Sequence, residues 1–250
     1  MKTLAVIQVQ NDYTRRGRAM LEMPDALPAP RVSDANEKMQ KTARVLAKHT
    51  GKRAKVVAFN LPAAIDFSVN GAKHNTCPQA GACKGVCYAR QNTFVYPGAI
   101  QLRVDNLWST FRPTFVDEMA DEIGKATHVR IHDSGDFYSQ EYLDSWIAIA
   151  RKRPDVVFYA YTKSLHLDWQ AAPENLRIVQ SEGGKLDAMI DYSRPHSRIV
   201  VDVPAGYTNG NAELADTPAI DGTVRIALPY HGGRKLTDSQ ARYFGGIHAG

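Results

Sequence analysis

The chain has 250 residues, a hydrophobic content of 44% and a charged content of 23%, which is ordinary for one large soluble domain or one domain with arms. No apolar run approaches the ~18 residues of a membrane span, and the apolar stretch at the N-terminus is too short for a secretory signal, so we expect a cytoplasmic protein without a membrane partner. The net charge of +5 permits an anionic partner such as nucleic acid, but the basic residues are dispersed, which favours an ordinary solvated surface.

The first 54 residues are expected to form an N-terminal arm and a helix. The pattern predicts a short strand over residues 4–9, an irregular segment with three prolines, and a helix from Ser33 or Asp34 to about His49 that Gly51 ends. The apolar run 55–59 then predicts the first buried strand. We expect residues 61–76 to form a loop that leads to the cysteines.

The second part of the chain, residues 55–250, is predicted to alternate between helices and strands. Apolar residues recur every three or four positions over 100–111, 115–123 and 142–150, which predicts three helices. Short apolar runs predict strands over residues 128–132, 156–161, 176–180, 198–203 and 224–228. This alternation is typical of an α/β protein with a parallel sheet.

All three cysteines of the chain lie within residues 77–87, which we call the cysteine loop. Cys77, Cys83 and Cys87 follow the spacing C-x5-C-x3-C, and soft thiolate ligands select zinc, copper(I) or iron–sulfur clusters. With His74 they would complete a Cys3His zinc site, as in a metal-stabilised binding module. Alternatively, the three thiolates would hold a [4Fe-4S] cluster whose fourth iron stays open. The spacing alone does not choose between these two sites.

Polar residues follow several of the predicted strands. Residues 133–136, 162–164 and 181–184 each come at the end of a strand, as do the residues after Val203. Parallel sheets and barrels bind ligands at the carboxyl ends of their strands. We therefore expect these segments and the cysteine loop to open onto one mouth.

Three segments together resemble the gene-product-88 family of phage and phage-derived proteins. They are Thr76-Cys-Pro with Cys83-Lys-Gly-Val-Cys-Tyr-Ala89, Ile131-His-Asp-Ser-Gly-Asp-Phe-Tyr-Ser139 and Phe158-Tyr-Ala-Tyr-Thr-Lys-Ser164, and the resemblance covers roughly residues 55–235. The family in turn resembles radical S-adenosylmethionine (SAM) enzymes. This implies a partial (β/α)6 TIM-like barrel, here with an N-terminal arm and helix, and places the protein in the host cytoplasm if a phage encodes it.

The resemblance also assigns roles to residues. It implies that Cys77, Cys83 and Cys87 ligate a [4Fe-4S] cluster, and that SAM, chelated by the fourth iron, is cleaved to an adenosyl radical. Ser134, Gly135 and Asp136 would receive the SAM ammonium group, Lys163 the SAM carboxylate and Ser181 the ribose. The substrate, and with it any catalytic residue, stays open; a basic phage protein weakly favours a nucleic acid.

Two departures from the radical SAM pattern keep an alternative open. That pattern is C-x3-C-x2-C with an aromatic residue before the last cysteine, whereas here the spacing is wider and Tyr88 follows Cys87. Many relatives are also expected to carry a second cysteine group late in the chain, where this sequence has residues 216–222 without cysteine. The alternative is an iron–sulfur protein that does not cleave SAM and serves electron transfer or sensing. A redox-active cluster would in either case need an electron donor.

Overall fold

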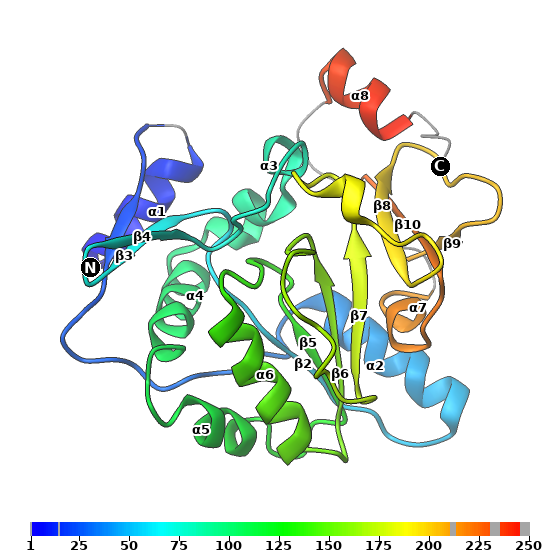
Figure 1. The fold of residues 1–250 in the computed structure, drawn as a ribbon, viewed down its shortest axis with the longest axis horizontal. Coiled ribbons are helices and arrows are strands. Elements are labelled where there is room, and N and C mark those ends of the chain that lie inside the picture. The colour runs from blue at the N-terminus through cyan, green and yellow to red at the C-terminus, as the bar shows by residue number, and fades with distance from the viewer. Residues whose placement is uncertain (1, 15, 211–213, 231–235, 246–250) are drawn as a thin grey trace.

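A parallel sheet of seven strands forms the centre of the protein in the computed structural model, which describes residues 2–14, 16–210, 214–230 and 236–245 (Figure 1). The strand order is β2-β5-β6-β7-β8-β10-β9, and every neighbouring pair is parallel. The strands are β2 (Val56–Phe59), β5 (His128–Ile131), β6 (Val157–Thr162), β7 (Leu176–Ser181), β8 (His196–Val200), β9 (Thr208–Asn209) and β10 (Arg225–Pro229). The predicted α/β class is therefore confirmed.

The sheet is open, with β2 and β9 at its two edges, so it does not close into a barrel. Its strands nevertheless follow one another across the sheet almost in chain order. In a doubly wound sheet the strand order reverses at a switch point. The strand order of this sheet has no such reversal between β2 and β8. Because parallel crossovers are right-handed, such an order places successive connections on the same face of the sheet.

Helices cover both faces of the sheet. The helices α4 (Pro97–Ser109), α5 (Phe115–Glu122) and α6 (Gln140–Lys152) lie together along one face, where they bury Phe59, Ile131 and Phe158 (Figure 1). The other face packs on α2 (Glu37–Thr50) and the short α7 (Thr217–Ile220), which bury Val56 and Ala58. Strands covered on both faces are apolar at successive positions, which made them easy to predict.

Local capping explains the helix boundaries. Asn36 accepts the Lys38 N–H and starts α2, three residues later than the first predicted cap, and Gly51 ends it with a φ of 68°. Ser139 caps α6 by accepting the Tyr142 N–H, as the sequence indicated.

The predicted strand over residues 4–9 is wrong: this segment is the helix α1 (Leu4–Tyr13). Thr3 accepts the Val6 N–H as its cap, and the spacing of the buried Val6, Val9 and Tyr13 is helical. The helix packs on α4, while α2 packs on β2, so both N-terminal helices contact elements of the second part of the chain. The division of the chain into residues 1–54 and 55–250 stays a prediction.

The predicted loop over residues 61–76 contains two of the three strands of a second, smaller sheet. It consists of β1 (Met20–Glu22), β3 (Asp66–Val69) and β4 (Ala72–Asn75) in the order β1-β3-β4. Asn70 and Gly71, both at positive φ, form the tight turn between β3 and β4. Asn-Gly is a strong hairpin signal, but the hairpin was not predicted from the sequence.

The remaining elements are short or lie late in the chain. They are α3 (Cys83–Val86), α8 (Asp238–Gly245) and three 3-10 turns, at Tyr88–Arg90, Asn92–Val95 and Asp187–Met189. The strand predicted over residues 198–203 begins and ends earlier, as β8. No helix in the described ranges is long and apolar enough to cross a membrane.

Candidate functional site

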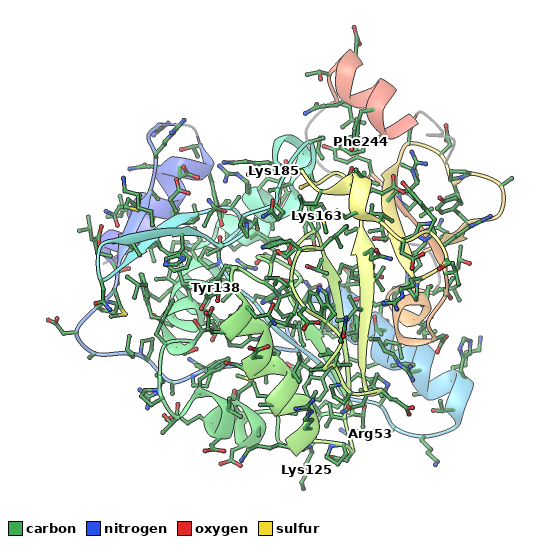
Figure 2. The ribbon with its side chains drawn as sticks, viewed as in Figure 1. Arg53, Lys125, Tyr138, Lys163, Lys185 and Phe244 are labelled. Carbon is green, nitrogen blue, oxygen red and sulfur yellow. The ribbon has the colours of Figure 1, made fainter. Side chains whose placement is uncertain are left out.

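A cavity of about 300 Å³ opens at the carboxyl ends of the central strands. The three cysteines and the residues that the resemblance assigns to SAM all line it: Cys77, Cys83, Cys87, Ser134, Gly135, Asp136, Lys163 and Ser181. Figure 2 shows Lys163 at this end of the sheet, below α3, whereas Arg53 and Lys125 lie at the opposite end. The expected convergence of the segments after β5, β6 and β7 is therefore confirmed. After β8 the prediction fails, since Ile199 and residues 228–230 line the cavity instead of the loop after Val203.

The cysteine loop is held in place by the segment after β7. The Gly81 and Cys83 N–H groups donate to the Gly183 carbonyl at 3.2 and 3.1 Å, and the Lys185 N–H donates to the Gln79 carbonyl at 2.9 Å. Ala80 and Gly184 form a β-bridge between the two segments. The cysteine loop is therefore hydrogen-bonded to the segment that follows the central strand β7, and Gly183 and Gly184 take part in these contacts.

The three thiols are free and partly buried, and they influence one another electrostatically. Burial, reinforced by the Asp136 carboxylate and the other two sulfurs, raises the pKa of Cys77 well above its ordinary value. Burial and the neighbouring Cys83 raise the pKa of Cys87 to about 11, against the opposing charge of Lys163. Cys77 and Cys87 are therefore thiols at neutral pH, and a metal that bound them would have to displace their protons.

The turn 134–136 is rigidly built. Gly135 has a φ of 90°, and an added Cβ would lie 2.6 Å from the Leu61 Cβ, so only glycine fits there. Ser134 donates its hydroxyl to the Leu61 carbonyl at 2.6 Å. Asp136 accepts from the Phe137 N–H, the Thr162 hydroxyl and the Lys163 N–H. Both carboxylate oxygens of Asp136 therefore serve to hold the turn against the end of β6.

Lys163 and Ser181 face each other across the ends of β6 and β7. The ammonium group of Lys163 donates to the Ser181 hydroxyl at 2.6 Å. This leaves the ammonium two further protons for a ligand in the cavity that both residues line. An anionic ligand group is therefore the natural partner at this point of the wall.

His74 is not placed with the cysteines. It lies on β4, its ring stacks on Phe67 at 5.2 Å, and it does not line the cavity. Among the described residues, no group of three or more His, Cys, Asp or Glu side chains is placed to hold a metal ion. This finding supports neither the Cys3His tetrahedron nor a cluster on the three cysteines, and His74 in addition lies outside the cavity.

The sheet face that packs on α2 and α7 contributes polar residues that were not predicted from the sequence. Arg130 on β5 donates to the buried Asp216 at 2.8 Å, and its guanidinium lies 5.3 Å from the ring centre of Tyr161. Burial is the largest single influence and opposes the charge of Arg130, but Asp216, Tyr88, Tyr159 and Asp133 together outweigh it and raise the pKa of the guanidinium. An arginine inside an apolar strand was the overlooked signal, because a buried charge needs a partner. Asp216 begins the segment where relatives were expected to carry further cysteines.

Tyr88 and Asp133 join the cysteine loop to this polar region. The Tyr88 hydroxyl donates to the Asp133 carbonyl at 2.5 Å, and the tyrosine ring packs edge-on against Phe94. The Asp133 side chain accepts from Asn36 at 2.5 Å through one oxygen. Residues directly before α2, after β5 and after the cysteine loop therefore meet at one end of the cavity.

Comparison with known proteins gives one family and two relatives. A protein-family model described as Gene product 88 matches residues 30–236. The chain is 30% identical to the Gene 88 protein of Mycobacterium phage L5, over 42% of this chain and 56% of that protein. It is 29% identical to the Gene 88 protein of Mycobacterium phage D29, over 44% of this chain and 58% of that protein. The chain thus spans a little over half the length of these relatives. No solved structure matches.

Proposed function

The chain belongs to the gene product 88 family, and we propose that it is an iron–sulfur protein whose three cysteines hold a [4Fe-4S] cluster in the strand-end cavity. The observation that carries this proposal is that every cysteine of the chain lines that one cavity, although six and four positions separate them along the loop.

The number of donors suits a cluster better than a single zinc ion. Zinc binds four protein ligands in a structural site, and the cavity offers it three thiolates. A cubane held by three cysteines leaves its fourth iron open. His74, the fourth ligand that zinc would need, stacks on Phe67 instead.

Burial raises the pKa of Cys77 and Cys87, but three features near the sulfurs favour a bound anionic cluster. The Ala64 N–H donates to the Cys77 sulfur at 3.3 Å, and hydrogen bonds to sulfur tune and stabilise such clusters. Lys163 and Arg90 add positive charge near Cys87, which lowers the cost of ionising that thiol. Apolar Ala63, Val86 and Ala89 line the same cavity and restrict water.

The finer proposal is that the open iron takes SAM, and that the chain is a phage relative of the radical SAM enzymes with an unclosed barrel. Lys163 would bind the SAM carboxylate, because it lines the cavity and its bond to Ser181 leaves ammonium protons for a ligand. The main chain of Ser134 and Gly135 would meet the SAM ammonium group, with Asp136 fixing their turn. Cluster and SAM together supply an adenosyl radical that abstracts hydrogen from a substrate.

Anaerobic purification followed by iron, sulfide and zinc analysis tests the cluster. We expect about four irons per chain, a broad absorption near ~400 nm, and loss of both in Cys77→Ala, Cys83→Ala and Cys87→Ala. His74→Ala is the matched control and should retain the iron. One zinc per chain that is lost in His74→Ala would overturn the cluster.

A second experiment separates the two iron–sulfur alternatives. Adding SAM and a strong reductant to the cluster-loaded protein should yield methionine and 5′-deoxyadenosine. An intact cluster that neither binds nor cleaves SAM would contradict the radical SAM proposal and favour electron transfer or sensing.

A further inference from the structure

The end of the cavity beside Tyr88 and Asp133 carries polar atoms that have no hydrogen-bond partner among the described residues. Asp133 Oδ1, the Tyr161 hydroxyl and His132 Nδ1 are all buried, and none has a hydrogen-bond partner among the described residues. Asp133 as a whole is only 6% exposed. All three residues line the cavity.

An unmet buried polar atom is costly, at roughly 1–3 kcal/mol each, and native proteins rarely leave one unpaired. In two of these side chains, Asp133 and His132, the second polar atom is held by a neighbouring residue. Asn36 holds Asp133 Oδ2, and the Tyr142 hydroxyl lies 2.8 Å from His132 Nε2. Their open atoms are thus held in place and are not free to turn toward other protein groups, as expected of a preformed binding site.

The charges around these atoms are already matched. Asp216 pairs with Arg130 at 2.8 Å and with Lys38 at 3.0 Å, and Asp133 adds a second acidic group beside the two cationic ones. Burial lowers the pKa of His132 to about 3, so its ring is neutral. A further net charge here would lack a partner, which favours an uncharged ligand group.

The walls beside the open atoms are aromatic. Tyr88, Phe94 and Tyr161 all line the cavity, and flat side chains of this kind pack well against a planar ring. Asp133 Oδ1 can only accept while the carboxyl is ionised, so the ring must offer it a donor. The Tyr161 hydroxyl can either donate or accept.

We propose that this end of the cavity is a binding subsite for an uncharged, planar heterocycle that donates a ring N–H to Asp133 and hydrogen-bonds to Tyr161, as a nucleobase with a ring lactam would. The proposal adds a ligand class to the proposed function. It does not depend on the cluster, because none of its residues is a cysteine.

Calorimetric titration with four nucleosides tests the subsite. Uridine and guanosine carry a ring N–H, whereas adenosine and cytidine do not. We expect saturable binding of uridine, guanosine or both, and binding at least roughly tenfold weaker for the other two and for the N-methylated form of the nucleoside that binds. Equal affinity after N-methylation, or no saturable binding of any of the four at millimolar concentration, overturns the proposal.

Two tyrosine variants separate a binding role from a structural one. Tyr161→Phe removes a hydroxyl that has no protein partner among the described residues, so it should weaken nucleoside binding about tenfold without lowering thermal stability. Tyr192→Phe, at a tyrosine that is 43% exposed, is the control and should bind like the parent. Loss of stability in Tyr161→Phe with unchanged binding would contradict the subsite.

The same titration on Cys83→Ala distinguishes this proposal from the cluster proposal. Nucleoside binding that persists without iron supports the subsite alone. Iron that is retained in the parent while no nucleoside binds would overturn the subsite and leave the cluster intact.

Discussion

Gly81 packs directly against Gly184: a Cβ added to Gly81 would lie 2.8 Å from both the carbonyl carbon and the carbonyl oxygen of Gly184. The two backbones therefore touch where the cysteine loop meets the segment after β7, and Cys83 is held beside this contact because its N–H donates to the Gly183 carbonyl.

Gly81→Ala should displace the cysteine loop. The added methyl group meets backbone, which cannot rotate away, so we expect a destabilisation of about 1–3 kcal/mol and a reduced iron content after anaerobic purification. Gly98→Ala is the control, because nothing lies within 4 Å of an added Cβ there. Iron content and melting temperature equal to those of the parent in Gly81→Ala would refute the role given to this contact.

Gly135→Ala tests the turn that carries Ser134 and Asp136. The substitution combines a φ of 90° with a contact of 2.6 Å to the Leu61 side chain, and we expect it to cost about 2–5 kcal/mol in urea unfolding. Gly51 also has a positive φ, of 68°, but open space around it. Gly51→Ala should therefore cost only about 1–2 kcal/mol, and a cost as large as that of Gly135→Ala would show that steric contact with Leu61 is unimportant.

Asp216→Ala tests the buried charge network. The substitution leaves Arg130 without its acidic partner inside the protein, and breaking a buried pair in this way costs about 3–5 kcal/mol. The exposed pair of Lys152 and Asp117 provides the comparison, since Asp117→Ala should cost less than about 1 kcal/mol. Similar unfolding free energies for the two variants would argue against the network as a structural element.

The depressed pKa of His132 predicts a dependence of stability on pH. The buried ring titrates near a pKa of about 3, whereas in the unfolded chain it would titrate near the ordinary 6.5. Between these values the unfolded state binds the extra proton, so acidification below pH 6.5 lowers stability by about 1.4 kcal/mol per pH unit. His132→Asn, chosen because asparagine tolerates the φ of 73°, should flatten this slope in urea unfolding at pH 5–6.5. An identical slope in the variant would mean that His132 is protonated in the folded state.

Lys163→Met tests the proposed SAM carboxylate contact. Loss of the ammonium group should weaken SAM binding by about tenfold or more while iron content stays that of the parent, because no cysteine is changed. The control is Lys125→Met, at the far end of the sheet from the cavity (Figure 2). SAM affinity that is equal in both variants would remove Lys163 from the proposed site.

Most of the fold could be predicted from local sequence patterns. The strands β2, β5, β6 and β7 and the helices α4 and α6 were predicted because their apolar spacing shows directly which faces are buried. The N-terminal helix was mistaken for a strand, since a short run of mixed polarity fits both periods until its packing on α4 decides. The hairpin of β3 and β4 was missed because its only clear sign is a two-residue turn.

The cysteine cluster and the polar segments at the strand ends could be read from local patterns, whereas the roles of the turn 134–136, Lys163 and Ser181 were implied by the family resemblance and stay predictions. Only the tertiary structure determines which groups surround these residues. It places His74 on Phe67 and outside the cysteine group, joins Arg130 to Asp216 across 86 positions of the chain, and leaves Asp133 and Tyr161 with open polar atoms among the described residues. The pairing of Arg130 with Asp216 joins residues far apart in sequence. No local pattern encodes it, because it depends on how α2 and α7 pack on the sheet.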